Sequence, residues 1–142
     1  MAGTKPGHDG REGVYAASTS TRIFQIWIEP STKGGQPTWG AKPFPKSDRS
    51  GKLVTIASGI AGDKDALPIR ADARVLATTL KAGESAEYED GKARHLYLVP
   101  AAGSVEVNGV RVNARDGAAI RNEAKLRITA LEDSEVVLVD AA

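Results

Sequence analysis

Side chains able to hold a metal ion are scarce in this chain. Its 142 residues contain two histidines, His8 and His95, and no cysteine. A transition-metal cage needs a cluster of imidazoles, often completed by a carboxylate. The two histidines lie far apart in the sequence, and the lack of cysteine excludes disulfides, thiolate zinc sites and a cysteine nucleophile. We therefore predict no bound metal and no cofactor, and keep His95 and His8 as the only candidate ligands.

His95 stands in an apolar run, residues 94–99, where it alternates with Tyr97 on the side opposite Leu96. It could act as a lone metal ligand or as a base inside a barrel. Because either role needs partner residues, we favour a strand histidine with ordinary hydrogen bonds. Acidic residues gather at 84–90, where a carboxylate-only site for a hard cation is one interpretation and a charged, solvated turn is the favoured one.

Three aromatic side chains are candidates for an interface. Trp27 alternates with Gln25 in an apolar run and suits a core or an interface. Trp39 lies in a loop of proline and glycine, where a tryptophan either anchors a partner or covers one end of a barrel. Phe44 lies between two prolines and is expected to do the same.

Composition excludes several classes of function. Apolar residues make up 41% of the chain and charged residues 26%, and the net charge is +1. No basic stripe is present, so we expect no nucleic-acid partner. No apolar run approaches the roughly 20 residues that cross a bilayer, and no apolar secretory leader is visible at the N-terminus. We therefore expect a cytoplasmic protein with no membrane partner.

The hydrophobic pattern predicts an all-β domain. Apolar alternation and turn residues recur about every 8–12 residues, as is typical of a sandwich or barrel, and Asn108-Gly109 is a strong hairpin signal. The first strand, 22–28, is apolar on both faces and should be covered on both. Residues 1–21 should form a flexible arm and 22–142 the domain. The predicted strands cover residues 22–28, 52–57, 67–69, 73–80, 86–88, 94–99, 103–107, 110–112, 118–121, 125–130 and 135–140.

The order of these segments resembles a cupin, an all-β double-stranded β-helix (jelly-roll) barrel. The resemblance rests on Lys-Ala-Gly-Glu at 81–84, on the strand and hairpin up to Gly109, and on Asp-Gly at 116–117 followed by a strand. A more specific resemblance is to the C-terminal cupin of the pirin-like bicupins, a family that includes quercetin dioxygenases. It rests on residues 25–30, 52–54, 69–73, 109–110 and 134–140.

This resemblance implies a fold more directly than an activity. Full-length members of that family carry two cupins, with three histidines and one glutamate as metal ligands in the N-terminal one, while the C-terminal cupin is generally metal-free. His8 is followed by Asp9 and Gly10, which do not match the ligand motif of the family. The metal site of the family therefore cannot be transferred to this chain.

Two hypotheses for function follow. The favoured one is a non-catalytic cupin domain with a structural, regulatory or partner-binding role. It would pair with another cupin domain or form a homodimer that buries the region of Trp27, Trp39 and Phe44. The alternative is a metal-dependent, quercetinase-like dioxygenase, or a protein that binds a small molecule inside the barrel.

Overall fold

A computed structural model describes residues 2–4, 14–16, 23–90 and 93–142. Within the predicted N-terminal arm, strands β1 (Ala2–Thr4) and β2 (Val14–Ala16) form a two-stranded antiparallel sheet. The rest of the predicted arm, including His8, and the predicted boundary at residue 22 lie outside the described residues.

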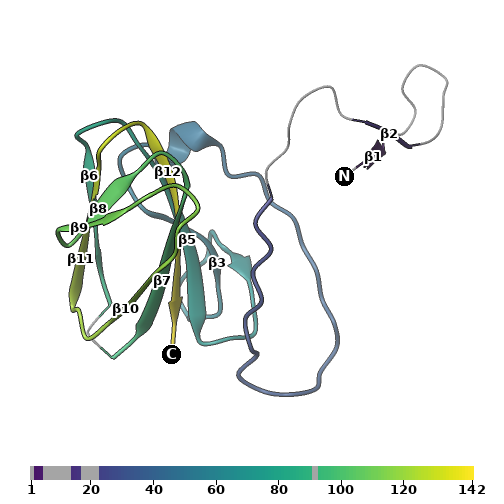
Figure 1. The fold of residues 1–142 in the computed structure, drawn as a ribbon. Coiled ribbons are helices and arrows are strands. Elements are labelled where there is room, and N and C mark those ends of the chain that lie inside the picture. Colours follow the sequence, from purple (N-terminus) through teal and green to yellow (C-terminus); the bar gives the residue numbers. More distant parts are fainter. Residues whose placement is uncertain (1, 5–13, 17–22, 91–92) are drawn as a thin grey trace.

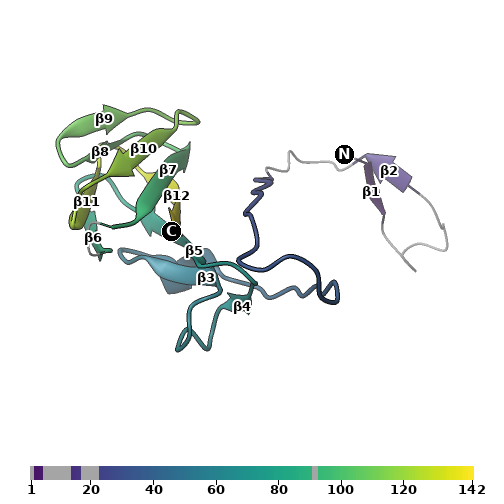
Figure 2. The same cartoon turned by 90° about the horizontal axis from the view of Figure 1, so that it is seen from below.

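Two antiparallel sheets face each other and form a sandwich (Figures 1 and 2). The larger sheet has the strand order β10-β7-β12-β5-β3-β4, and the smaller has the order β6-β11-β8-β9. Among the strand pairs of the described residues, the short β3–β4 pair alone is parallel. The elements are η1, a 3₁₀ helix (Lys46–Arg49), and strands β3 (Val54–Ser58), β4 (Leu67–Pro68), β5 (Ala73–Leu80), β6 (Ser85–Glu89), β7 (His95–Ala102), β8 (Val105–Val107), β9 (Val110–Val112), β10 (Ala118–Arg121), β11 (Lys125–Ala130) and β12 (Ser134–Ala141).

Aliphatic side chains from both sheets fill the interior of the sandwich. Strand β12 pairs with β5 on one side and with β7 on the other, so that Leu138 lies between Leu76 and Leu98. All three leucines are buried, and each contributes about 1.5–3 kcal/mol through burial. The core cluster consists of Leu76, Leu80, Ala86, Leu96, Leu98, Val105, Val107, Val112, Leu126, Ile128, Ala130, Val136 and Leu138.

The predicted hairpin is present between β8 and β9. Asn108 and Gly109 have φ angles of 48° and 87°, as a tight hairpin turn requires. The Asn108 side chain also fixes the neighbouring strand, because its amide nitrogen donates to the carbonyl of Lys125 at 3.1 Å and its oxygen accepts from the backbone N–H of Arg127 at 2.8 Å.

The prediction of a first strand at 22–28 is wrong for the residues that the structure describes. Residues 23–30 have no strand assignment, and this segment runs outside the two sheets (Figure 2). A strand is stable only when a neighbouring strand accepts its hydrogen bonds, and none of the described strands pairs with this segment. Ile23 and Trp27 are 66% and 87% exposed.

The described part of the chain contains no helix that is long and apolar enough to span a membrane.

Candidate functional site

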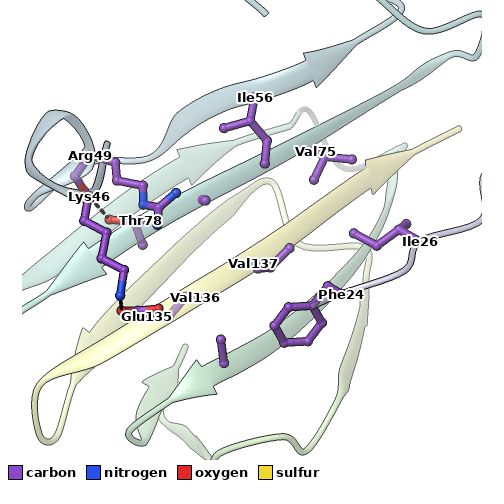
Figure 3. A pocket seen from close by; sticks show the side chains of 12 residues that line it. Phe24, Ile26, Lys46, Arg49, Ile56, Val75, Thr78, Glu135, Val136 and Val137 are labelled. Carbon is purple, nitrogen blue, oxygen red and sulfur yellow. Dashed lines mark hydrogen bonds and ion pairs between the residues drawn. The ribbon is translucent and has the colours of Figure 1, made fainter. Parts of the chain in front are cut away.

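A groove with a volume of about 800 Å³ runs along the outer face of the larger sheet (Figure 3). Val137 of β12 and Val75 of β5 lie along it, and Phe24 and Ile26 from the extended N-terminal segment lie beside Val137. The complete lining is Phe24, Ile26, Lys46, Arg49, Ile56, Val75, Ala77, Thr78, Ala101, Glu135, Val136 and Val137.

The outer face is apolar because the strands of the larger sheet carry apolar residues on both sides. In β12, Val136 and Leu138 are buried in the core, while the alternate residues Val137 and Val139 on the other face are only partly buried. Strands with two apolar faces are typical of sheets that are covered on both sides. The groove is therefore a part of this sheet that is only partly covered.

Charged side chains lie at one end of the groove. Lys46 forms an ion pair with Glu135 across the gap between η1 and β12. Arg49 donates from Nη1 to the carbonyl of Phe44 at 3.4 Å, and its own carbonyl accepts from Thr78 Oγ1 at 3.3 Å. The Arg49 Nε atom is buried without a hydrogen-bond partner in the part of the chain that the structure describes.

The structure places the predicted interface aromatics outside the core. Trp27 and Trp39 are 87% and 92% exposed, and Phe44 is partly buried with Lys42 Nζ 5.7 Å from the centre of its ring. Trp27 is therefore not a core residue, and Trp39 covers no end of the barrel. Ile28 and Thr38, which neighbour the two tryptophans in the sequence, line one shared pocket against β4.

His95 lies on the exposed face of β7 and not inside the sandwich. Its neighbours Leu96 and Leu98 point into the core, whereas His95 and Tyr97 are exposed. Among the described residues, no group of three or more histidine, cysteine, aspartate or glutamate side chains could hold a metal ion. At 84–90, Glu84 accepts a backbone hydrogen bond and Glu87 pairs with Lys125. Most of this segment forms strand β6 and is not the turn that we expected, and its acidic side chains are surface groups.

A buried polar network closes one end of the sandwich. Asp140 at the end of β12 is 1% exposed and accepts a hydrogen bond from Arg94 Nε at 2.7 Å and another from the Tyr88 hydroxyl. Arg94 also donates to the carboxylate of Asp72 at 2.7 Å. Burial disfavours the charged form of Arg94, but the two carboxylates outweigh this effect and raise its pKa.

The network continues to the loop between β3 and β4. Arg74 donates from Nε to Asp63 at 2.6 Å and from Nη1 to the Tyr88 hydroxyl at 3.4 Å. Ser58 donates to the same carboxylate at 2.5 Å. Hydrogen bonds from Arg74 and Ser58 lower the pKa of Asp63, and the bond with Asp63 raises the pKa of Arg74. Paired in this way, these charges join loops and strands that are distant in sequence.

Tyr88 gives this network a measurable pH dependence. Burial, followed by its hydrogen bond to Asp140, raises the pKa of Tyr88 from 10.0 to about 12. The folded state holds the proton of the Tyr88 hydroxyl more tightly than the unfolded state. The contribution of this hydroxyl to the free energy of unfolding is therefore complete below pH 10 and is lost as the pH rises through about 12. We expect the stability difference between wild type and Tyr88→Phe to shrink across this range in urea denaturation. A constant difference would contradict the assignment.

Sequence reasoning missed both the groove and the network. The network joins residues that are spread from Ser58 to Asp140, and each of its charged residues looks like an ordinary surface residue in the sequence. The sequence did contain a signal for the groove, because β12 is apolar on both faces. Val136 and Leu138 lie on the core face, and Val137 and Val139 lie on the outer face.

Two facing antiparallel sheets around an aliphatic core have the architecture of a cupin-type β-sandwich. The sequence profile of the quercetinase C-terminal cupin domain matches residues 55–141. The chain therefore belongs to this family of pirin-like cupins, and its predicted fold and family are confirmed.

Relatives place the chain more closely within the family. A protein named pirin-like protein from Caulobacter vibrioides is 72% identical over 123 residues, which cover 87% of this chain and 53% of that protein. The crystal structure of YhhW from Escherichia coli superimposes with a TM-score of 0.74 at 27% identity, over 82% of this chain and 48% of YhhW. A second structure, of bacterial pirin YhhW in complex with nickel(II), gives a TM-score of 0.58 at 28% identity, over 63% of this chain and 38% of that one. The chain thus spans about half the length of the curated relatives it matches.

Proposed function

We propose that this chain is a structural cupin domain that docks a second cupin domain through the segment 23–28 and the adjoining groove. The observation that carries the proposal is the exposure of this segment. Ile23, Phe24, Ile26 and Trp27 are 66%, 45%, 41% and 87% exposed, and no strand among the described residues pairs with them. Apolar surface gathered in this way is typical of an interaction site.

The position of the segment supports the same function. The domain profile begins at residue 55, so residues 23–28 lie outside the part of the chain that matches the C-terminal cupin. Relatives that are about twice as long offer a second half in which a partner for the segment would lie. When this chain is alone, a second copy of it is the partner that we expect.

The nickel(II) ion of the YhhW complex does not fit the interior of this cupin. The side chains of the core cluster are aliphatic, and the interior position next to the outward-facing His95 is the buried Leu96. The buried carboxylate of Asp140, at the end of the sandwich, is already paired with Arg94. The cross-strand neighbour of Leu96 on β10 is Ile120, which packs against the core. Aliphatic side chains are not metal ligands, and one paired carboxylate does not form a cage, so the core offers no ligand set for a metal.

A second candidate function is oxygenation of a flavonol-like substrate, and the quercetinase description of the family favours it. In that case the metal ligands would belong to residues outside the cupin core described here. A small molecule inside the sandwich would first have to displace the buried leucines.

Light scattering after size exclusion tests the docking proposal. At tens of micromolar, we expect the wild-type chain to be a dimer. The variant Trp27→Ala should weaken the dimer roughly 30-fold, because a central interface aromatic contributes about 2 kcal/mol or more. Trp39→Ala and Phe44→Ala show how far the interface extends.

The matched control is Val110→Ala, which removes an apolar side chain that is 65% exposed on β9, in the other sheet. It should leave the dimer unchanged. A wild-type chain that is monomeric at tens of micromolar, or equal effects of the Trp27 and Val110 variants, would overturn the proposal.

A further inference from the structure

A second, smaller pocket lies on the outer face of the larger sheet, at the opposite end of β7 and β12 from the groove. The groove lies beside Ala101 and Glu135, whereas this pocket lies beside His95 and Ala141. Its volume is about 240 Å³. Its lining is His95, Leu96, Tyr97, Ala119, Ile120, Arg121, Val139 and Ala141.

Strand register gathers three polar side chains around this pocket. His95 and Tyr97 are alternate residues of β7 and lie on the same face. Arg121 of β10 is the direct cross-strand partner of His95, which brings the guanidinium to that face as well. On the other side of β7, Val139 of β12 pairs with Tyr97 and provides an apolar floor.

The polar groups of this pocket are free to bind a ligand. Within the described residues, the side chains of His95, Tyr97 and Arg121 make no hydrogen bond or ion pair, and no carboxylate lines the pocket. An arginine that is not neutralised beside small apolar side chains favours an anion with an apolar body. The planar guanidinium matches a carboxylate in particular, because it can donate two parallel hydrogen bonds.

Gly117 sets the position of the Tyr97 ring. A Cβ atom at residue 117 would lie 1.9 Å from Tyr97 Oη and 2.4 Å from Tyr97 Cζ. The Tyr97 ring therefore lies directly against a backbone position that only glycine leaves open. This contact holds an exposed ring, 50% accessible, as one wall of the pocket.

We propose that this pocket binds a small aromatic carboxylate. The carboxylate would accept hydrogen bonds from Arg121 and His95, and the ring of the ligand would lie against Tyr97 and Val139. A pocket of about 240 Å³ is smaller than the sites that hold drug-sized molecules, so the ligand has a single ring. The proposal does not depend on the docking function of the groove.

Titration of the full ¹⁵N-labelled chain with benzoate, followed by NMR, tests this site. We expect saturable shifts of the amide signals at residues 95–97, 119–121 and 139–141, with a Kd on the order of 1 mM. Arg121→Gln should weaken binding about tenfold or more, because it removes a charge-assisted hydrogen bond. Gly117→Ala should weaken binding by displacing Tyr97.

Two controls make the result specific. Arg127→Gln removes the same charge from an exposed position on β11, in the opposite sheet, and should leave the Kd unchanged. Benzamide keeps the ring without the negative charge and should not bind. The proposal is overturned if benzoate gives no saturable shifts at these residues or if benzamide binds equally well. It is also overturned if Arg121→Gln binds benzoate with the Kd of wild type, as the control Arg127→Gln should.

Discussion

Replacing Asp140 with alanine will lower the free energy of unfolding by about 3–5 kcal/mol, because it removes the buried partner of a partly buried charge. Asp140 is 1% exposed and accepts hydrogen bonds from Arg94 and Tyr88. Without the carboxylate, the guanidinium keeps only its bonds to Asp72. Urea denaturation followed by far-ultraviolet circular dichroism measures the loss.

Asp72→Ala is the matched control for this prediction. Its carboxylate also accepts a hydrogen bond from Arg94 at 2.7 Å, but its side chain is 56% exposed. An ion pair with an exposed partner contributes up to about 1 kcal/mol, so the control should lose no more than that. Equal losses in the two variants would show that burial does not strengthen the Asp140 interactions.

Leu138→Ala will destabilise the domain by about 2–5 kcal/mol through lost burial and the cavity left behind. Leu138 lies at the centre of the larger sheet between Leu76 and Leu98, and all three are buried in the interior. The same urea denaturation measures the change. The size of the loss reports how tightly the interior is packed.

Val139→Ala is the control on the opposite face of the same strand, where the side chain is only partly buried. It should cost roughly 1 kcal/mol, because it removes less buried surface. If the two variants lose equal stability, the interior is not the tightly packed core described here.

Strand positions could be predicted from the sequence wherever local pattern and turn residues agreed. The predicted strands at 73–80, 118–121 and 125–130 have the same bounds as β5, β10 and β11. At 23–28 the same kind of pattern failed, because an apolar alternation predicts what a strand would bury but not whether a neighbouring strand exists. Pairing is a property of the whole fold.

The candidate sites were less predictable for the same reason. The exposure of Trp27 follows from the missing strand neighbour of its segment, which no local pattern indicates. The position of His95 on an outer face follows from its alternation with Leu96, but its approach to Arg121 depends on the register between β7 and β10. The apolar pattern predicts which face of each strand is buried, but it does not predict which residue of β10 lies opposite His95.

The core of this cupin is packed with aliphatic side chains and is not a metal cage. The metal content of untagged protein, measured by inductively coupled plasma mass spectrometry, tests this interpretation most directly. We predict iron, nickel, copper and manganese well below one equivalent per chain. Any one of them near one equivalent would contradict the claim and would direct attention to His95 and the carboxylates nearest to it.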